Sequence, residues 1–346
     1  MDIRRIQDAD LENKKVLLRV DFNVAVENGK VKESFKIAAA KETLDYLLNK
    51  NCKVAMITHL GRPDGQVDSK FSVRQIAGDV EDILATGITF VSDCIGEKVK
   101  EALEHMVGGA LLLENVRFYA GDESNDVEFA KQLAENFDVF VQDAFSVSHR
   151  DQASVTGVAK ILPSCAGFRM LEEIHEMTII KEHPVSPAVA IIGGAKIETK
   201  IPVIKFFEEK YDHILVGGKI ANEALDQNIE FSDKVVLPVD FVDDRLDIGP
   251  ETVEKFKAII ASAKTIAWNG PTGKFEDEKY AKSSNEILEA VIASGAFVLV
   301  GGGETLEILE KNHAMDDISF VSTGGGAMLD FLAGNAMPGI EALSRG

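Results

Sequence analysis

Five segments in the second half of the chain share one pattern, a hydrophobic and largely β-branched run that ends in glycine. Strands that are covered on both faces of a parallel sheet have this composition. Glycine at the turn after each strand lets backbone N–H groups close on a phosphate. The pattern therefore predicts a parallel sheet with a phosphate-binding edge. The segments are Ala190–Gly194, Ile214–Gly218, Ile266–Gly270, Val298–Gly303 and Phe320–Gly326.

The first half of the chain also alternates strands with helices, but polar and cationic residues follow its strands. Ligands of open α/β sheets bind outside the carboxyl ends of the strands. Arginine suits a bidentate grip on a carboxylate or phosphate, so several at this level indicate a small polyanion. The residues that follow the strands are Asp21, Asn23, His59, Arg62, Arg117, His149 and Arg150.

The alternation predicts an α/β fold of two doubly wound parallel-sheet domains, Rossmann-like, joined by a hinge helix. A loop at 162–167 before a helix at 170–181 places the domains at 1–167 and 168–334. The residues alone leave the tail after Pro338 open to either domain, and we predict that 335–346 returns to the first. Strands are expected at 15–21, 53–58, 88–92, 110–114, 138–142, 188–192, 213–216, 234–237, 264–268, 296–300 and 318–322, and further helices at 37–48, 73–84 and 283–292.

The net charge of −20 disfavours nucleic acid as a partner, because a polyanion would be repelled at long range. The cysteines Cys52, Cys94 and Cys165 are widely spaced and show no metal-ligand pattern, which is typical of reduced core thiols. No apolar run approaches the roughly 20 residues of a membrane span. We therefore expect a cytoplasmic protein that binds neither nucleic acid nor membrane.

Common nucleotide-site motifs fail in this sequence. Gly270–Lys274 has two residues between its glycines where a P-loop needs four. His149-Arg150-Asp151 resembles the start of a protein-kinase catalytic loop, but the required asparagine would fall at Thr156. No G-x-G-x-x-G follows the first strand, which disfavours a nicotinamide dehydrogenase.

Charged residues at two predicted helix starts could bind a ligand or could have a purely structural role. Lys196 and Lys200 are four residues apart at one predicted helix start, so they share a face beside its positive end, although a solvated face would look the same. Glu304 and Thr305 follow Gly303 at another, where a divalent ion that bridges phosphates would find a ligand. A carboxylate that only stabilises the helix dipole fits equally well.

A series of motifs along nearly the whole chain resembles, in order, those of the phosphoglycerate kinase family. The resemblance implies reversible phosphoryl transfer between 1,3-bisphosphoglycerate and Mg-ADP, in line and after domain closure, giving 3-phosphoglycerate and Mg-ATP. It implies Mg²⁺ as cofactor and a monomeric glycolytic transferase. The motifs are Arg19–Val24, Thr58–Pro63, Leu113–Phe118, Asp143–Phe145 with His149-Arg150, Gly193–Lys196, Leu237–Asp240, Asp247–Pro250, Trp268–Pro271 and Val321–Ala327.

The same resemblance assigns roles to individual residues, with Glu304 also as the metal ligand. Substrate-binding residues would be Asp21, Asn23, Lys36, His59, Arg62, Arg117 and Arg150. Catalytic groups would be Lys36, Lys196, Gly302 and Gly325. Nucleotide-binding residues would be Gly194, Lys200, Gly218, Asn269, Glu276 (at the ribose), Gly303, Glu304 and Thr305.

Several positions depart from the family pattern. Lys36 stands where the family has an arginine implicated in stabilising transition-state charge, and Glu304 where it has the metal-binding aspartate. Lys219 and Arg245 replace glycines near the family's adenine pocket, and the segment 224–247 is shorter than usual. A catalytically impaired relative that binds anions or a partner is therefore the alternative hypothesis, and the nucleotide preference stays open.

Overall fold

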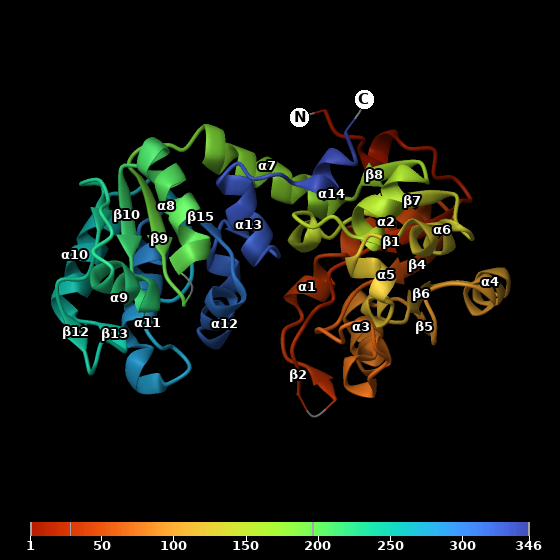
Figure 1. The fold of residues 1–346 in the computed structure, drawn as a ribbon, viewed down its shortest axis with the longest axis horizontal. Coiled ribbons are helices and arrows are strands. Elements are labelled where there is room, and N and C mark those ends of the chain that lie inside the picture. The colour runs from red at the N-terminus through yellow and green to blue at the C-terminus, as the bar shows by residue number, and fades with distance from the viewer. Residues whose placement is uncertain (1, 28, 196, 345–346) are drawn as a thin grey trace. The chain divides into compact units, whose positions relative to one another are not determined.

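The computed structural model describes residues 2–27, 29–195 and 197–344 of the chain. The chain forms two compact units, one of Met1–Glu173 with Ala336–Gly346 and one of Ile174–Asn335. Each unit contains a six-stranded parallel sheet with helices packed around it (Figure 1). The predicted fold class, α/β with two doubly wound parallel sheets, is confirmed. No helix within the described part of the chain is long and apolar enough to cross a membrane.

The sheet of the first unit has the strand order β5-β6-β4-β1-β7-β8. Val16 and Leu18 of β1 pack in one hydrophobic core and Leu17 in another, because alternate side chains of a strand point to opposite faces. The order reverses beside β1, which is where open α/β sheets bind ligands. The strands are β1 (Lys15–Arg19), β4 (Lys53–Ile57), β5 (Ile88–Val91), β6 (Ala110–Leu113), β7 (Val139–Gln142) and β8 (Ser164–Ala166).

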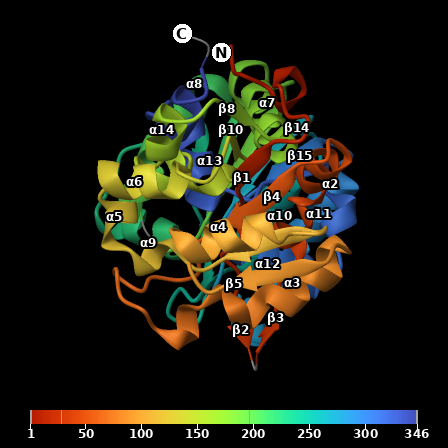
Figure 2. The ribbon, with the colours of Figure 1, turned by 90° about the vertical axis from the view of Figure 1, so that its right-hand side faces the viewer.

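Helices cover both faces of this sheet, and α3 and α4 pack against the β5 edge (Figure 2). The C-terminal segment belongs to this unit as well: Gly339 N donates to Ser148 O at 2.8 Å, and Arg4 N donates to Leu343 O at 3.0 Å. A two-stranded hairpin, β2 (Val26–Glu27) with β3 (Lys30–Val31), projects from it. The helices are α1 (Phe35–Ala38), α2 (Lys41–Asn49), α3 (Ala77–Leu84), α4 (Glu97–Glu104), α5 (Ala120–Glu123), α6 (Val127–Ala134) and α14 (Pro338–Glu341).

The sheet of the second unit has the order β11-β10-β9-β14-β15-β16. Every residue of β9 is buried, as expected for a strand covered on both faces. The reversal of strand order lies beside β9, so its glycine turn sits at the ligand-binding position of this fold. The strands are β9 (Ala188–Ile192), β10 (His213–Val216), β11 (Val235–Val236), β14 (Thr265–Asn269), β15 (Phe297–Val300) and β16 (Phe320–Val321), with a separate pair β12 (Phe241–Val242) and β13 (Asp247–Ile248).

The helices of the second unit follow its strands in the manner of βαβ crossovers. Two of them, α12 and α13, begin at the glycine runs after β15 and β16. They are α8 (Ile197–Lys210), α9 (Gly218–Asp226), α10 (Pro250–Ile260), α11 (Lys282–Ala293), α12 (Gly303–Lys311) and α13 (Gly325–Leu332).

Helix α7 (Phe168–Glu182) is the segment predicted as a hinge helix, and the compact units divide inside it, after Glu173. Phe168 N donates to Thr43 Oγ1 at 2.9 Å, and Met170 N donates to Asp143 Oδ1 at 3.1 Å. The start of α7 is thus held by the first unit, so the division lies beyond the 167/168 boundary expected from the sequence.

Two local predictions were wrong. The segment 162–167 was expected to be a loop, but Ser164–Ala166 pairs with β7 as the edge strand β8. Three small residues carry no periodicity, so only the pairing with β7 identifies the strand. The helix expected at 37–48 is split, because α1 ends at Ala38 and α2 begins at Lys41.

Candidate active site

Cationic side chains converge at the carboxyl edge of the first unit's sheet. His59 follows β4 and is 4% exposed. Its pKa lies well below the ordinary value, first because of burial and then because Arg19, Arg117, Arg150 and Lys36 are close enough to oppose a further positive charge. The structure therefore brings together residues from five separate segments of the chain, and the strand-end pattern had singled out His59, Arg117 and Arg150 among them.

Lys36 and Asp21 form an ion pair within this cluster. Lys36 Nζ lies 3.1 Å from Asp21 Oδ2, with the two side chains 18% and 5% exposed. Lys36 Nζ also donates to Asn23 O at 3.2 Å. Burial alone would raise the pKa of the Asp21 carboxyl, but chiefly the Lys36 ammonium outweighs it and holds this pKa below its ordinary value. Lys36 is thus held in place by its surroundings.

Asn23 ties two of the loops together. Its side-chain Oδ1 accepts a hydrogen bond from Gly61 N at 2.9 Å, and its N–H donates to Asp21 Oδ1 at 3.0 Å. The loop after β1 therefore fixes the loop that carries His59 and Arg62. Arg62 itself is exposed.

Arg117 and Arg150 differ in how firmly they are held. Arg117, 3% exposed, donates from Nη1 to Gly61 O at 2.9 Å, and its Nε lies 3.3 Å from a Glu123 oxygen. Burial lowers the pKa of Arg117, and Arg150 lowers it further. Arg150, half-buried, donates from Nε to His149 Nε2 at 3.3 Å.

Arg19 is a member of this cluster that the sequence did not single out as a site residue. It ends β1, is fully buried, and places Nη2 3.3 Å from His59 Nδ1. Burial lowers the pKa of Arg19 to about 10. Its position at a strand end beside Asp21 was the available signal, but a hydrophobic strand with a terminal arginine is equally typical of a surface ion pair.

Glycine turns from three strands of the second unit pack directly on one another. Gly193 N donates to Asn269 O at 3.0 Å, and Gly218 N donates to Thr272 O at 2.8 Å. Gly270 has φ of +102°, and a Cβ there would lie 2.3 Å from Gly193 O. A side chain at this position is therefore excluded by both the backbone conformation and the neighbouring strand.

Lys200 projects from α8 to Asn269 at the end of β14, and its Nζ donates to Asn269 Oδ1. Lys200 is 8% exposed and Asn269 is 4% exposed. Burial lowers the pKa of Lys200 to about 8, against the opposing effect of Glu304. The Lys200 ammonium is thus poorly solvated, and nearby negative charge does not fully compensate for its burial. A phosphate group would supply the missing negative charge.

The starts of α12 and α13 approach each other closely. A Cβ at Gly325 would lie 3.0 Å from Gly302 Cα, and one at Gly302 would lie 3.2 Å from Asn269 Nδ2. The first N–H groups of a helix have no partner within the helix, and the helix dipole favours an anion there. Glu304 in the first turn of α12 has a raised pKa, first because of burial and then because of Glu276.

A cavity of about 400 Å³ lies beside these turns. It brings together four of the predicted nucleotide-binding residues, Gly194, Gly218, Glu276 and Glu304. The departures Lys219 and Arg245 also line it, with Asn222, Leu246 and Phe275. Thr305 is instead fully buried, where its Oγ1 accepts from Gly270 N at 2.8 Å. Lys196, predicted to be catalytic, lies outside the described residues.

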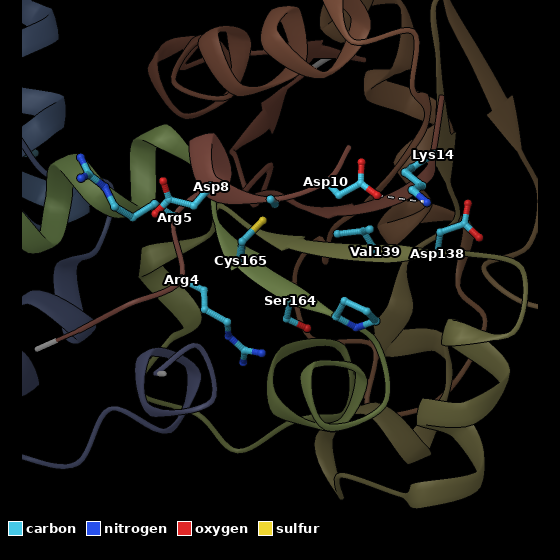
Figure 3. A pocket seen from close by; sticks show the side chains of 11 residues that line it. Arg4, Arg5, Asp8, Asp10, Lys14, Asp138, Val139, Ser164 and Cys165 are labelled. Carbon is cyan, nitrogen blue, oxygen red and sulfur yellow. Dashed lines mark ion pairs between the residues drawn. The ribbon is translucent and has the colours of Figure 1, made fainter. Parts of the chain in front are cut away.

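A second cavity, of about 300 Å³, lies at the opposite edge of the first unit's sheet (Figure 3). It is lined by the amino ends of β1, β7 and β8, including Lys14 and Asp138. Lys14 Nζ pairs there with Asp10 Oδ2 at 3.6 Å. This cavity contains none of the predicted site residues, because those follow the carboxyl ends of the same strands.

Known proteins resemble the chain over nearly all of its length. The phosphoglycerate kinase of Coprothermobacter proteolyticus is 37% identical over 389 residues, with 99% of each chain covered. That of Pseudothermotoga lettingae is 38% identical over 388 residues, with 98% of each covered. Since this chain has 346 residues, these relatives contain segments that it lacks.

Solved structures of phosphoglycerate kinases are also similar to this chain. Phosphoglycerate kinase from Pyrococcus horikoshii OT3 superposes with a TM-score of 0.89 at 29% identity, covering 99% of this chain and 98% of the other. The Coxiella burnetii structure gives 0.80 at 32% identity, with the same coverage. A family profile described as phosphoglycerate kinase matches residues 6–236 and 227–335. The chain belongs to the phosphoglycerate kinase family.

Proposed function

We propose that the protein is a phosphoglycerate kinase. It transfers a phosphoryl group reversibly between 1,3-bisphosphoglycerate and Mg-ADP to give 3-phosphoglycerate and Mg-ATP. The observation that carries this proposal is the match to phosphoglycerate kinases across 99% of both chains, at 37% identity. The alternative, a non-catalytic relative, is not favoured, because the relatives match over both units and the cationic cluster is intact.

The first unit would bind 3-phosphoglycerate at its cationic cluster. Asp21, His59 and Arg117 are buried there, so substrate binding would displace little water from these side chains. A carboxylate and a phosphate need several positive donors, and guanidinium groups provide them in planar pairs. The full set proposed to hold the substrate is Asp21, Asn23, Lys36, His59, Arg62, Arg117 and Arg150.

The second unit would bind the nucleotide at its glycine turns. The cavity beside Gly194 and Gly218 has the volume of a small-ligand site. Glu276 would accept from the ribose, and Lys200 would contact phosphate. The helix starts at Gly302–Thr305 and Gly325 would stabilise phosphate oxygens, and Asn269 would hold Lys200 in place.

The residues present fit a magnesium ion that arrives with the nucleotide. Among the described residues no cluster of three or more histidine, cysteine or acidic side chains could hold a metal by itself. Glu304 supplies one carboxylate in the first turn of α12, and Mg²⁺ is commonly bound by one or two carboxylates together with substrate phosphates. When bound, the ion would neutralise charge on the phosphates.

Catalysis would depend on position and electrostatics. The acceptor carboxylate is ionised at neutral pH, so no general base is required. Lys36, Lys196, Gly302 and Gly325 would stabilise charge on the moving phosphoryl group after closure of the two units, with transfer in line. We further propose that the enzyme works as a cytoplasmic monomer.

A coupled assay tests the function. The wild type, Lys36→Arg, Glu304→Asp and the double variant would be given 3-phosphoglycerate and Mg-ATP, with 1,3-bisphosphoglycerate formation followed through NADH oxidation. We expect turnover by the wild type that requires both substrates. Turnover only in the double variant would indicate a site impaired at these two positions. Silence from all four proteins would overturn the proposal.

A further inference from the structure

Arg19 and His59 form a buried contact that the roles proposed above do not use. The last residue of β1, Arg19, pairs in register with Ile57, two residues before His59. Arg19 is fully buried and His59 is 4% exposed. Arg19 Nη1 donates to Val20 O at 2.6 Å and lies 3.4 Å from Ile57 O. The guanidinium is therefore fixed by both strands, with Nη2 directed at His59 Nδ1, 3.3 Å away.

The chemistry of the two groups determines which nitrogen of His59 carries the proton. A guanidinium has five N–H donors and no acceptor, so the histidine nitrogen that faces it must accept. The pKa of Arg19, about 10, leaves it charged at neutral pH. An imidazole that accepts at Nδ1 and is neutral carries its single proton on Nε2.

Four cationic side chains act on His59. Besides Arg19 on β1, these are Lys36 on α1, Arg117 after β6 and Arg150 after β7. Burial and these four cations together hold the pKa of His59 well below its ordinary value. A fifth positive charge is thus disfavoured at this point of the cluster, and His59 stays neutral at physiological pH.

The second ring nitrogen is left for a ligand. Within the described residues, no hydrogen bond uses His59 Nε2. The loop that carries it is held independently, because Thr58 Oγ1 accepts from Phe22 N at 2.9 Å and Asn23 Oδ1 accepts from Gly61 N at 2.9 Å. The Nε2–H group therefore has a fixed direction and remains available to donate a hydrogen bond to a ligand.

We propose that Arg19 is a positioning residue that locks His59 as the neutral Nε2–H tautomer, so that His59 donates one uncharged hydrogen bond to an oxygen of 3-phosphoglycerate. The lysine and arginines of the cluster then supply the positive charge that binds the substrate, and the hydrogen bond from His59 orients the substrate. This inference rests on the proposed function for the identity of the ligand. The tautomer itself is a property of the free protein.

The first test is nitrogen NMR on the wild type at pH 7.5, with ¹⁵N-labelled histidine and the His59 signals assigned through His59→Gln. We expect an acceptor-type shift at Nδ1, an N–H-type shift at Nε2, and a change at Nε2 on adding 3-phosphoglycerate. A proton on Nδ1, or an imidazolium, would overturn the proposal. Because this readout needs no turnover, it holds even if the enzyme assay fails.

The second test compares Arg19→Met, which lacks a donor, with Arg19→Lys, which keeps one. We expect both tautomers of His59 in Arg19→Met, and a KM for 3-phosphoglycerate raised about tenfold, the equivalent of ~1.4 kcal/mol. The KM for the nucleotide should not change. Arg19→Lys should restore the Nε2–H tautomer and most of the affinity. The exposed Arg74→Met is the control for loss of one positive charge in the same unit.

The outcomes separate positioning from a purely structural role. If Arg19→Met keeps a pure Nε2–H tautomer, the proposal is wrong, whatever happens to its activity. The same holds if both KM values rise together while the tautomer is unchanged. If Arg19→Met does not fold, the wild-type spectrum and Arg19→Lys decide alone, since a wild-type proton on Nδ1 would still refute the inference.

Discussion

Lys36 Nζ lies 3.1 Å from Asp21 Oδ2, and the carboxylate of this pair is 5% exposed. A buried carboxylate that loses its partner costs about 3 to 5 kcal/mol. We expect Lys36→Met to lower the free energy of unfolding by about 3 kcal/mol in urea titrations, because Lys36 itself is partly exposed. Adding Asp21→Asn should recover part of the loss. Strictly additive losses in the double variant would show that the two side chains do not interact.

The same lysine provides a test of rate. Lysine presents a compact charge, whereas arginine presents a planar fork that matches phosphate oxygens. We expect Lys36→Arg to raise kcat several-fold, with KM for 3-phosphoglycerate nearly unchanged, because the gain belongs to the transition state. Lys36→Met should lower kcat by roughly 10²- to 10³-fold, as for loss of an oxyanion donor. A fall in kcat in Lys36→Arg would mean that the site is adapted to lysine.

Lys200 predicts how nucleotide affinity depends on pH. Burial lowers its pKa from 10.5 to about 8, so the ammonium loses its proton as pH rises through 8. We expect the Kd for free nucleotide, measured by calorimetry, to rise across this range, and Lys200→Met to bind weakly at every pH. Between pH 8 and 10.5 the folded state binds fewer protons here than the unfolded state. Stability from this group therefore increases as pH rises in that window.

If Lys200→Met binds nucleotide with the same pH dependence as the wild type, the group that titrates is not Lys200. Lys200→Arg is the matched control, because arginine keeps its charge across the range. Its affinity should stay level between pH 7 and 9.

Glu304 predicts a link between the metal and Lys200. Glu304→Gln should raise KM for Mg-nucleotide on the order of tenfold, about 1.4 kcal/mol, while affinity for metal-free nucleotide changes little. It should also move the Lys200 titration to lower pH, since Glu304 raises the pKa of Lys200. Glu307→Gln, on the same helix and paired with Lys311, is the control. Equal losses with and without Mg²⁺ would remove the metal role from Glu304.

Gly270 predicts a cost that depends on backbone alone. Its φ is +102°, and a Cβ would lie 2.3 Å from Gly193 O. We expect Gly270→Ala to lower the free energy of unfolding by about 3 kcal/mol, combining steric overlap with the strain of positive φ. Gly303→Ala, where a Cβ meets nothing within 4 Å, should change stability by less than about 1 kcal/mol. Similar thermal midpoints for the two variants would contradict this account.

Much of the architecture could be predicted from local pattern. The predicted strand at 188–192 and that at 213–216 match β9 and β10, because short hydrophobic runs that end in glycine turns have few other interpretations. The edge strand β8 and the break between α1 and α2 could not. The three-residue strand β8 is recognised only by its pairing with β7. The break between α1 and α2 lies inside one amphipathic stretch, so the hydrophobic periodicity does not reveal it.

The candidate site divides in the same way. Residues after strand ends were predictable, since parallel strands bring their carboxyl ends to one edge. The role of Arg19 was not, because it depends on the register that places Arg19 opposite Ile57 and next to His59. The burial of Thr305 could not be predicted either, because its hydroxyl accepts a hydrogen bond from Gly270 N, 35 residues away in the sequence.

The sequence by itself determined the two parallel sheets, the edge at which each presents its polar residues, and the family to which the chain belongs. Those features follow from hydrophobic pattern and from motifs that are contiguous in the chain. Only the tertiary structure decided how deeply Lys200, His59 and Arg19 are buried and which charges surround them. Desolvation and Coulomb energy depend on the segments that pack around a group, and those segments are distant in sequence.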